Sequence, residues 1–251
     1  MFDLQGHVSV VTGGNGGIGL GMARGLGRAG AKIAIWARNS EKNEKAVASL
    51  QAQGIDALAL RCDVSSPESV QEALGATLER YGRVDSCFAN AGVGRAVKFA
   101  DMTLDDWNAV VDVNLVGAFL TFREVSRHMV ERGGGGSLVG IASIGALHGM
   151  PRQAQYSASK AGLTALVRSV AVEFGRNGIR ANTILPGWIE TDMTADARGW
   201  EKLRTTVEKR TPAGRWGRPE DFEGVAVYLA SNESAFHNGD VLRVDGGYAI
   251  Y

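Results

Sequence analysis

Segments typical of strands and of helices alternate along the whole chain, and this alternation restricts the possible folds more than any other feature of the sequence. The predicted strands are short apolar or β-branched runs at residues 7–12, 32–36, 57–61, 84–89, 137–142, 180–185 and 241–244. The predicted helices have apolar residues at helical spacing, at 18–29, 40–53, 67–81, 104–131 (one helix or two), 153–176, 200–210 and 219–229. The pattern predicts an α/β fold with a doubly wound, mainly parallel, seven-stranded sheet and helices on both faces.

Several of the predicted strands are apolar throughout, including the runs VSVV, KIAIW and SLVGI. Such runs are typical of strands that are buried on both faces of a parallel sheet. No linker rich in proline or serine and no block of like charge divides the chain. Residues 1–251 are therefore predicted to form a single domain.

Composition and charge favour a soluble cytoplasmic protein. The 27 basic and 27 acidic residues balance, so no basic face for nucleic acid is indicated. No apolar run is long enough to span a membrane, and the first residues lack the pattern of a secretory signal. Cys62 and Cys87 belong to no metal-binding pattern, so no metal is expected, and both are predicted to be buried thiols.

A glycine-rich loop, TGGNGGIG at Thr12–Gly19, lies between the first predicted strand and the first predicted helix. Gly13 allows the tight turn, Gly17 lets the backbone approach a pyrophosphate, and Gly19 lets helix and strand pack closely. The helix N-terminus offers free N–H groups to that anion. The alternative is a glycine-rich turn without a ligand, but the position in the first strand–helix unit favours a dinucleotide site.

The end of the second strand bears on which dinucleotide binds. It reads Trp36-Ala37-Arg38-Asn39, so Ala37 stands where an acid would hold the ribose hydroxyls. A guanidinium at Arg38 suits a ribose 2′-phosphate, which favours NADP(H) over NAD(H), although NAD(H) stays possible. Two observations weigh against this preference. Arg38 could simply be an ordinary solvent-exposed residue at the end of a strand, and the glycine loop contains no second basic residue.

Tyr156 and Lys160 are four residues apart in a predicted helix, so their side chains share one face. A nearby ammonium favours the phenolate and lowers the pKa of a tyrosine. The pair is then able to exchange a proton with a carbonyl or alcohol oxygen while a hydride moves. On spacing alone, an ordinary pair on a helix surface is the better explanation of these residues.

Together with these features, further short motifs make the chain resemble the short-chain dehydrogenase/reductase family, which has a Rossmann fold, over nearly its whole length. The motifs, in family order, are TGGNGGIG at Thr12–Gly19, CDV at Cys62–Val64, NAG at Asn90–Gly92, VNL at Val113–Leu115, SI at Ser143–Ile144, YSASK at Tyr156–Lys160, PGWIET at Pro186–Thr191 and VDGG at Val244–Gly247.

The resemblance implies a catalytic set and a cofactor set. Tyr156 is expected to be the general acid/base, Lys160 to hold the nicotinamide ribose, Ser143 to bond the substrate oxygen, and Asn114 to hold a water that links Lys160 to solvent. The expected cofactor contacts are Gly13, Asn15, Gly17, Ile18, Gly19, Arg38, Asn39, Asp63, Val64, Asn90, Ala91, Gly92, Tyr156, Lys160, Pro186, Gly187, Ile189 and Thr191. The resemblance also implies a homotetramer, or a dimer, formed through helices 104–131 and 153–176.

The expected reaction interconverts a ketone and a secondary alcohol with a nicotinamide cofactor. A 3-oxoacyl thioester reductase or a sugar or polyol dehydrogenase is the alternative, and a non-catalytic dinucleotide sensor is a third. Residues 188–215 are expected to cover the substrate. The apolar side chains in and near this segment either line a pocket or pack the lid on the core: Val93, Leu147, His148, Met150, Trp188, Met193 and Trp200.

Overall fold

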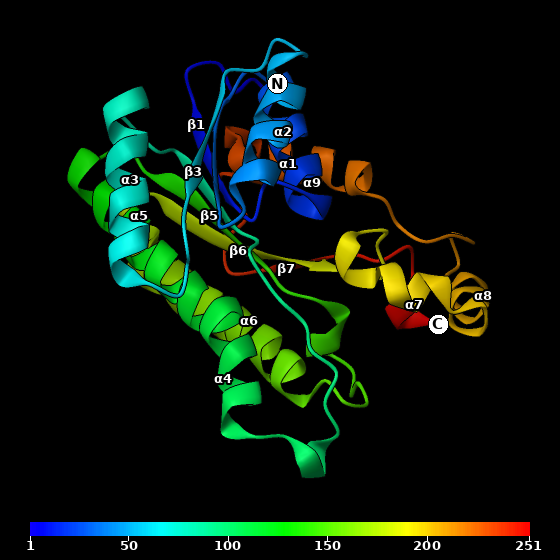
Figure 1. Cartoon of the computed structure of the whole chain (residues 1–251). Coiled ribbons are helices and arrows are strands. Elements are labelled where there is room, and N and C mark those ends of the chain that lie inside the picture. Colours follow the sequence, from blue (N-terminus) through cyan, green and yellow to red (C-terminus); the bar gives the residue numbers. More distant parts are fainter.

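The computed structural model describes residues 1–251 and contains a seven-stranded sheet in which every pairing is parallel (Figure 1). The strand order is β3-β2-β1-β4-β5-β6-β7. Successive strands are therefore added toward one edge of the sheet from β1 to β3 and toward the other edge from β4 to β7, and this order reverses between the neighbours β1 and β4. The predicted doubly wound fold is confirmed. The strands are β1 Val8–Thr12, β2 Lys32–Ala37, β3 Ala57–Arg61, β4 Ser86–Ala89, β5 Gly136–Ile141, β6 Ile179–Pro186 and β7 Val241–Val244.

Helices cover both faces of this sheet (Figure 1). One face is covered by α1, α2 and α9, and the other by α3, α5 and α6. No helix combines the length and apolar character needed to cross a membrane. The helices are α1 Gly17–Arg28, α2 Ser40–Gln51, α3 Pro67–Tyr81, α4 Leu104–Val111, α5 Gly117–Arg132, α6 Ala154–Phe174, α7 Ala195–Gly199, α8 Glu201–Arg210 and α9 Glu223–Ala230.

The apolar strands explain the two layers of core. Consecutive side chains of a strand point to opposite faces, so Val11 packs under α1 whereas Val10 packs under the α3–α5–α6 layer. Each layer supplies an apolar helix stripe, as Met22 and Leu26 do on α1. The strands are thereby held in register, and their carboxyl ends form one edge of the sheet.

The segment predicted as one helix or two contains α4 and α5, joined without a break by a π-helical turn, Asp112–Val116. A π turn widens the helix by one residue and is frequent at functional sites. Here it contains Asn114, which is buried. The distortion therefore coincides with a residue that the sequence placed in the catalytic set.

Candidate active site

A cavity of about 290 Å³ lies at the carboxyl ends of the central strands, beside the point where the strand order reverses. Open parallel sheets bind ligands at this edge. Of the predicted site residues, the cavity is lined by Gly13, Asn15, Gly17, Ile18, Asn90, Ala91, Gly92, Ser143, Tyr156, Lys160, Pro186, Gly187, Ile189 and Thr191.

The glycine loop leaves the N-terminus of α1 open to a ligand. No side chain caps this helix, and its first turn contains no acid. Gly13 and Gly17 have φ of +62° and +51°, which only glycine adopts readily. The uncapped N–H groups and the helix dipole therefore fit the pyrophosphate of a dinucleotide.

Gly19 does not line the cavity, because it lies behind the loop. A Cβ there would stand 2.5 Å from both the Gly13 carbonyl oxygen and the Asn90 amide nitrogen. The Asn90 side chain donates to the carbonyl oxygens of Thr12 and Gly13, at 3.0 and 3.2 Å. Gly19 and Asn90 thus hold β1, the loop and β4 together under the cleft.

A second cavity, of about 340 Å³, continues from the first toward the ends of β2 and β3. Arg38, Asn39 and Val64 line it. Asn39 also caps α2 by accepting a hydrogen bond from the Lys42 N–H at 2.9 Å. Asp63 does not line this cavity. Its carboxylate accepts from the N–H and hydroxyl of Ser65, which lowers the pKa of Asp63, and lies 3.9 Å from Arg38.

Lys42 is a site residue that the sequence reasoning missed. It borders both cavities, and its Nζ lies 2.7 Å from the Asp192 carboxylate across the cleft. The glycine loop has no second cation, but the first turn of α2 supplies one. Its position four residues after Arg38, at the start of a helix, was the available signal.

Tyr156 and Lys160 lie on α6 with their side chains toward the cavity. Lys160 Nζ donates to the Ile141 carbonyl oxygen at 2.8 Å and stands 5.8 Å from the centre of the Tyr156 ring. Lys160 is 4% exposed, and its burial lowers the pKa of the ammonium to about 8. The charge of this lysine is therefore easier to remove than that of a solvated one.

The pKa of Tyr156 departs from the sequence expectation. Burial raises the pKa of the phenol, and the nearby Ser143 hydroxyl offsets this only in part. The sequence predicted that Lys160 lowers the pKa of Tyr156. The raising effect of burial is larger, because a buried phenolate loses its hydration. Tyr156 accordingly keeps its proton at neutral pH, as a proton donor must.

The Asn114 side chain links the π turn to the loop after β4 and to α6. It accepts from the Val93 N–H at 2.8 Å and donates to the Val93 carbonyl oxygen and the Ser159 hydroxyl, at 3.0 and 3.1 Å. A Cβ on Gly92 would lie 3.2 Å from Asn114 Oδ1 and 3.3 Å from Lys160 Nζ. Asn114 and Lys160 therefore flank the same point of the loop after β4.

Ser143 follows β5 and caps a short 3-10 helix, Ile144–Ala146. Its Oγ accepts from the Gly145 N–H at 3.0 Å. This bond uses a lone pair and leaves the hydroxyl proton free. The hydroxyl is available to donate to a ligand in the cavity.

The segment expected to cover the substrate forms a 3-10 turn, Asp192–Thr194, followed by α7 and α8. Met193 lines the main cavity, and Val93 the second. Trp188 packs edge-on against Trp216, with 5.3 Å between ring centres, and Trp200 is exposed. Of the expected residues, Met193 and Val93 thus line a cavity and Trp188 packs, whereas Trp200 and Leu147 are exposed and line neither cavity.

Gln153 is a second residue that the sequence reasoning missed. Its Oε1 is buried without a hydrogen-bond partner. A Cβ on Gly94 would lie 3.9 Å from this oxygen and 3.8 Å from the Tyr156 ring. Gln153 does not line the cavity, but its free acceptor lies near the ring of the candidate proton donor.

Comparisons with known proteins agree with this geometry. The family profile described as enoyl-(acyl carrier protein) reductase matches residues 13–249. The chain is 39% identical to an L-rhamnose 1-dehydrogenase (NAD(P)(+)) of Sphingomonas sp. strain SKA58, covering 98% of both chains. It is 36% identical to a gluconate 5-dehydrogenase of Gluconobacter oxydans, covering 100% of this chain and 97% of the relative.

A solved structure of a gluconate 5-dehydrogenase from Burkholderia cenocepacia J2315, in complex with NADP and tartrate, superposes with a TM-score of 0.94. The sequences are 36% identical, and the match covers 100% of this chain and 98% of the other. The matches span whole chains and include both the nucleotide cleft and the tyrosine–lysine helix. This chain therefore belongs to the short-chain dehydrogenase/reductase family.

Proposed function

We propose that this protein is an NADP(H)-preferring oxidoreductase that interconverts a secondary alcohol and a ketone on a sugar or sugar acid. One observation carries the proposal: Tyr156, Ser143 and Lys160 line the same cavity as the open N-terminus of α1. A group that exchanges protons thereby stands beside a site that fits a dinucleotide.

The chemistry divides between cofactor and protein. When bound, the nicotinamide cofactor supplies or accepts the hydride. Tyr156 donates its proton to the carbonyl oxygen in reduction and takes one from the alcohol in oxidation. Ser143 donates a hydrogen bond to the same oxygen, and the Lys160 ammonium stabilises the phenolate that Tyr156 becomes. Asn114 holds a water that connects Lys160 to solvent.

The preference for a sugar or sugar acid over an acyl thioester carried by a protein rests on the relatives and on Gln153. The two relatives reported above are named for L-rhamnose and gluconate, and a 3-oxoacyl-(acyl-carrier-protein) reductase of Chlamydia pneumoniae is 37% identical as well. In the covering segment, Arg198 and Arg215 are paired with Glu190 and Asp221, at 3.1 and 2.7 Å. Charge alone does not separate the two substrate classes, because four basic residues of the same segment have no acidic partner: Lys202, Arg204, Lys209 and Arg210. The free Gln153 acceptor suits a hydroxyl group.

The experiment that tests the proposal measures oxidation of gluconate, L-rhamnose and a simple secondary alcohol, each with NADP⁺ and NAD⁺. We expect a sugar or sugar acid to be oxidised with the higher kcat/KM, and NADP⁺ to be the better acceptor. Oxidation of the simple alcohol alone would contradict the substrate class. Absence of turnover with every substrate, together with tight NADP⁺ binding, would favour a dinucleotide sensor.

Arg38 and Lys42 are the proposed basis of the NADP(H) preference. For Arg38→Ala we expect kcat/KM with NADP⁺ to fall by about tenfold or more, because one charge-assisted bond to the 2′-phosphate is lost. The value with NAD⁺ is expected to change little. Lys45→Ala is the control, since Lys45 is exposed on α2, the helix that carries Lys42, and pairs with Glu41. Equal losses with both cofactors would contradict the assignment.

Gln153 is the proposed contact for a substrate hydroxyl. For Gln153→Leu, which keeps the side-chain volume but removes the acceptor, we expect KM for the sugar substrate to rise by about tenfold. The Kd for NADP⁺ is expected to stay unchanged, because the bond is to the substrate. A lower kcat at unchanged KM would instead indicate that Gln153 positions Tyr156.

We further propose a homotetramer and a lid. Apolar side chains on α5 and α6 are exposed in the single chain, notably Phe119 at 43% and Val172 at 84%. Burying such side chains in a second copy would remove apolar area from water. Residues 188–215 are proposed to cover the substrate, with the Lys42–Asp192 pair tying this segment to α2.

A further inference from the structure

A third cavity, separate from the two that form the nucleotide cleft, lies at the opposite edge of the sheet from the candidate active site. It has a volume of about 730 Å³. It is bordered by the residues that precede or begin β1, β4, β5 and β6, namely His7, Asp85, Gly136 and Arg180. No residue of this cavity lines the nucleotide cleft.

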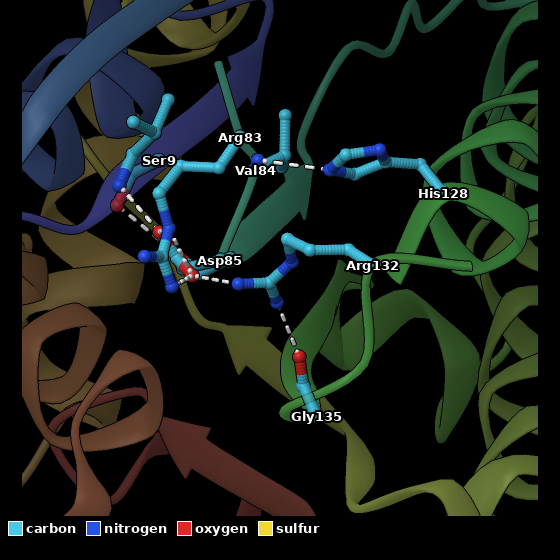
Figure 2. Close-up of polar contacts among 9 residues, drawn as sticks. Ser9, Arg83, Val84, Asp85, His128, Arg132 and Gly135 are labelled. Carbon is cyan, nitrogen blue, oxygen red and sulfur yellow. Dashed lines mark hydrogen bonds and ion pairs between the residues drawn. The ribbon is translucent and has the colours of Figure 1, made fainter. Parts of the chain in front are cut away.

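One carboxylate at this edge is held by two guanidiniums (Figure 2). Arg83 binds Asp85 through Nε and Nη2, and Arg132 binds the same carboxylate through Nη1 at 2.7 Å. A further bond comes from the Val8 N–H at 2.9 Å. Although burial acts in the opposite direction, these partners keep the pKa of Asp85 below its usual value. Asp85 is therefore ionised and already saturated with donors.

Arg180 borders the same cavity and has no acidic partner. Its Nη2 donates to the carbonyl oxygens of Leu229 and Ser231, at 2.9 and 3.2 Å. Its Nη1 is out of reach of solvent, and no protein group accepts from it. A partly desolvated guanidinium without a counter-ion is costly, so the site favours an anion.

The balance of charge selects the kind of anion. Asp85 is the only acid that lines the cavity, and Arg83 and Arg180 are the two guanidiniums that line it, while Arg132 binds Asp85 from outside the lining. Together these three guanidiniums outnumber the one carboxylate. Two positive charges are therefore in excess. Arg83 is 47% exposed and has its Nη1 free, and the backbone N–H groups of Gly134 and Gly135, which line the wall, make no hydrogen bond within the chain.

We propose that this cavity is a second ligand site, which binds the phosphate group of a small metabolite between Arg83 and Arg180. A phosphate dianion matches the two excess charges, and a carboxylate supplies only one. The volume exceeds what an inorganic phosphate needs, so a phosphorylated sugar also fits. The apolar side chain of Phe236, fully exposed at the rim, is placed to contact the rest of such a molecule.

The test is isothermal titration with inorganic phosphate, glucose 6-phosphate and glucose, at constant ionic strength and with saturating NADP⁺ to block the nucleotide cleft. We expect both phosphates, but not glucose, to bind with one-to-one stoichiometry. Tighter binding of glucose 6-phosphate identifies a phosphorylated metabolite as the ligand, and equal binding identifies the phosphate ion. Absence of saturable binding by either phosphate overturns the proposal.

Two variants locate the bound phosphate. Arg180→Gln is expected to raise its Kd by about tenfold or more, because a positive charge without an acidic partner is lost from the cavity wall. Arg83→Gln, at a half-exposed position, is expected to raise the Kd as well, and it serves where Arg180→Gln does not fold. The control is Arg176→Gln, which removes the same charge from an exposed residue outside the cavity. Unchanged Kd in Arg83→Gln and in folded Arg180→Gln shows that phosphate binds elsewhere and overturns the proposal.

Discussion

Replacing Tyr156 by phenylalanine is expected to lower kcat by about 10²- to 10⁴-fold, the usual range for loss of a positioned acid–base group. The substitution removes only the hydroxyl. The ring is partly buried on α6 and lines the cavity, so its packing and the cavity shape persist. The raised pKa keeps Tyr156 protonated and ready to donate in ketone reduction. In alcohol oxidation the same oxygen accepts the proton in its phenolate form, so phenylalanine is expected to lower the rate in both directions.

Steady-state kinetics in both directions, together with the Kd for NADP⁺, measure this effect. The Kd is expected to change little, which separates a chemical role from a binding one. Tyr81→Phe is the matched control, because that hydroxyl bonds Asp56 on the far side of the molecule from the cavity. If Tyr156→Phe kept full activity, another group would be the proton donor and the proposed mechanism would be wrong.

The layers of the fold were predictable because burial imposes simple periodicities. Strands such as Val8–Thr12 are buried on both faces, and the sequence there is apolar at every position. Helix α3 begins at Pro67 with Ser66 as its cap and ends before Gly82 in the left-handed conformation, and each of these signals is local. The π turn at Asp112–Val116 has no such signal. It follows from how Asn114 bonds Val93, a contact made across the fold.

The residues of the candidate site could be predicted where they lie in one contiguous motif. Contacts between elements that are distant in the sequence could not be predicted. The glycine loop and the α6 pair are each contiguous, so their spacing indicates their geometry. Lys42 and Asp192 are 150 positions apart and pair only because α2 and the covering segment border one cleft. The pKa of Tyr156 likewise depends on burial, which spacing does not reveal. Sequence reasoning therefore identified the reacting groups better than their electrostatics.

Lys160 combines a catalytic role with an energetic cost. We expect Lys160→Met to lower kcat/KM by about a hundredfold or more, because the ammonium no longer stabilises the phenolate or holds the cofactor. Arg168→Met, on the same helix, is the control for loss of a charge. Retention of wild-type kcat/KM in Lys160→Met would exclude Lys160 from the mechanism.

The same variant is expected to be more stable than the wild type at neutral pH. Burial lowers the pKa of Lys160 from 10.5 in a solvated chain to about 8, so the folded state binds fewer protons between these values. The free energy of unfolding of the wild type therefore rises with pH across this interval, by up to ~3 kcal/mol from this group. Below pH 8 the full cost of burying the ammonium remains.

Methionine lacks this charge, so the stability advantage of Lys160→Met should be largest below pH 8 and shrink toward pH 10.5. Urea unfolding of both proteins across this range, without cofactor, measures the difference, in which the other titrating groups cancel. A difference independent of pH would show that the ammonium carries no burial cost and that its charge is solvated or paired.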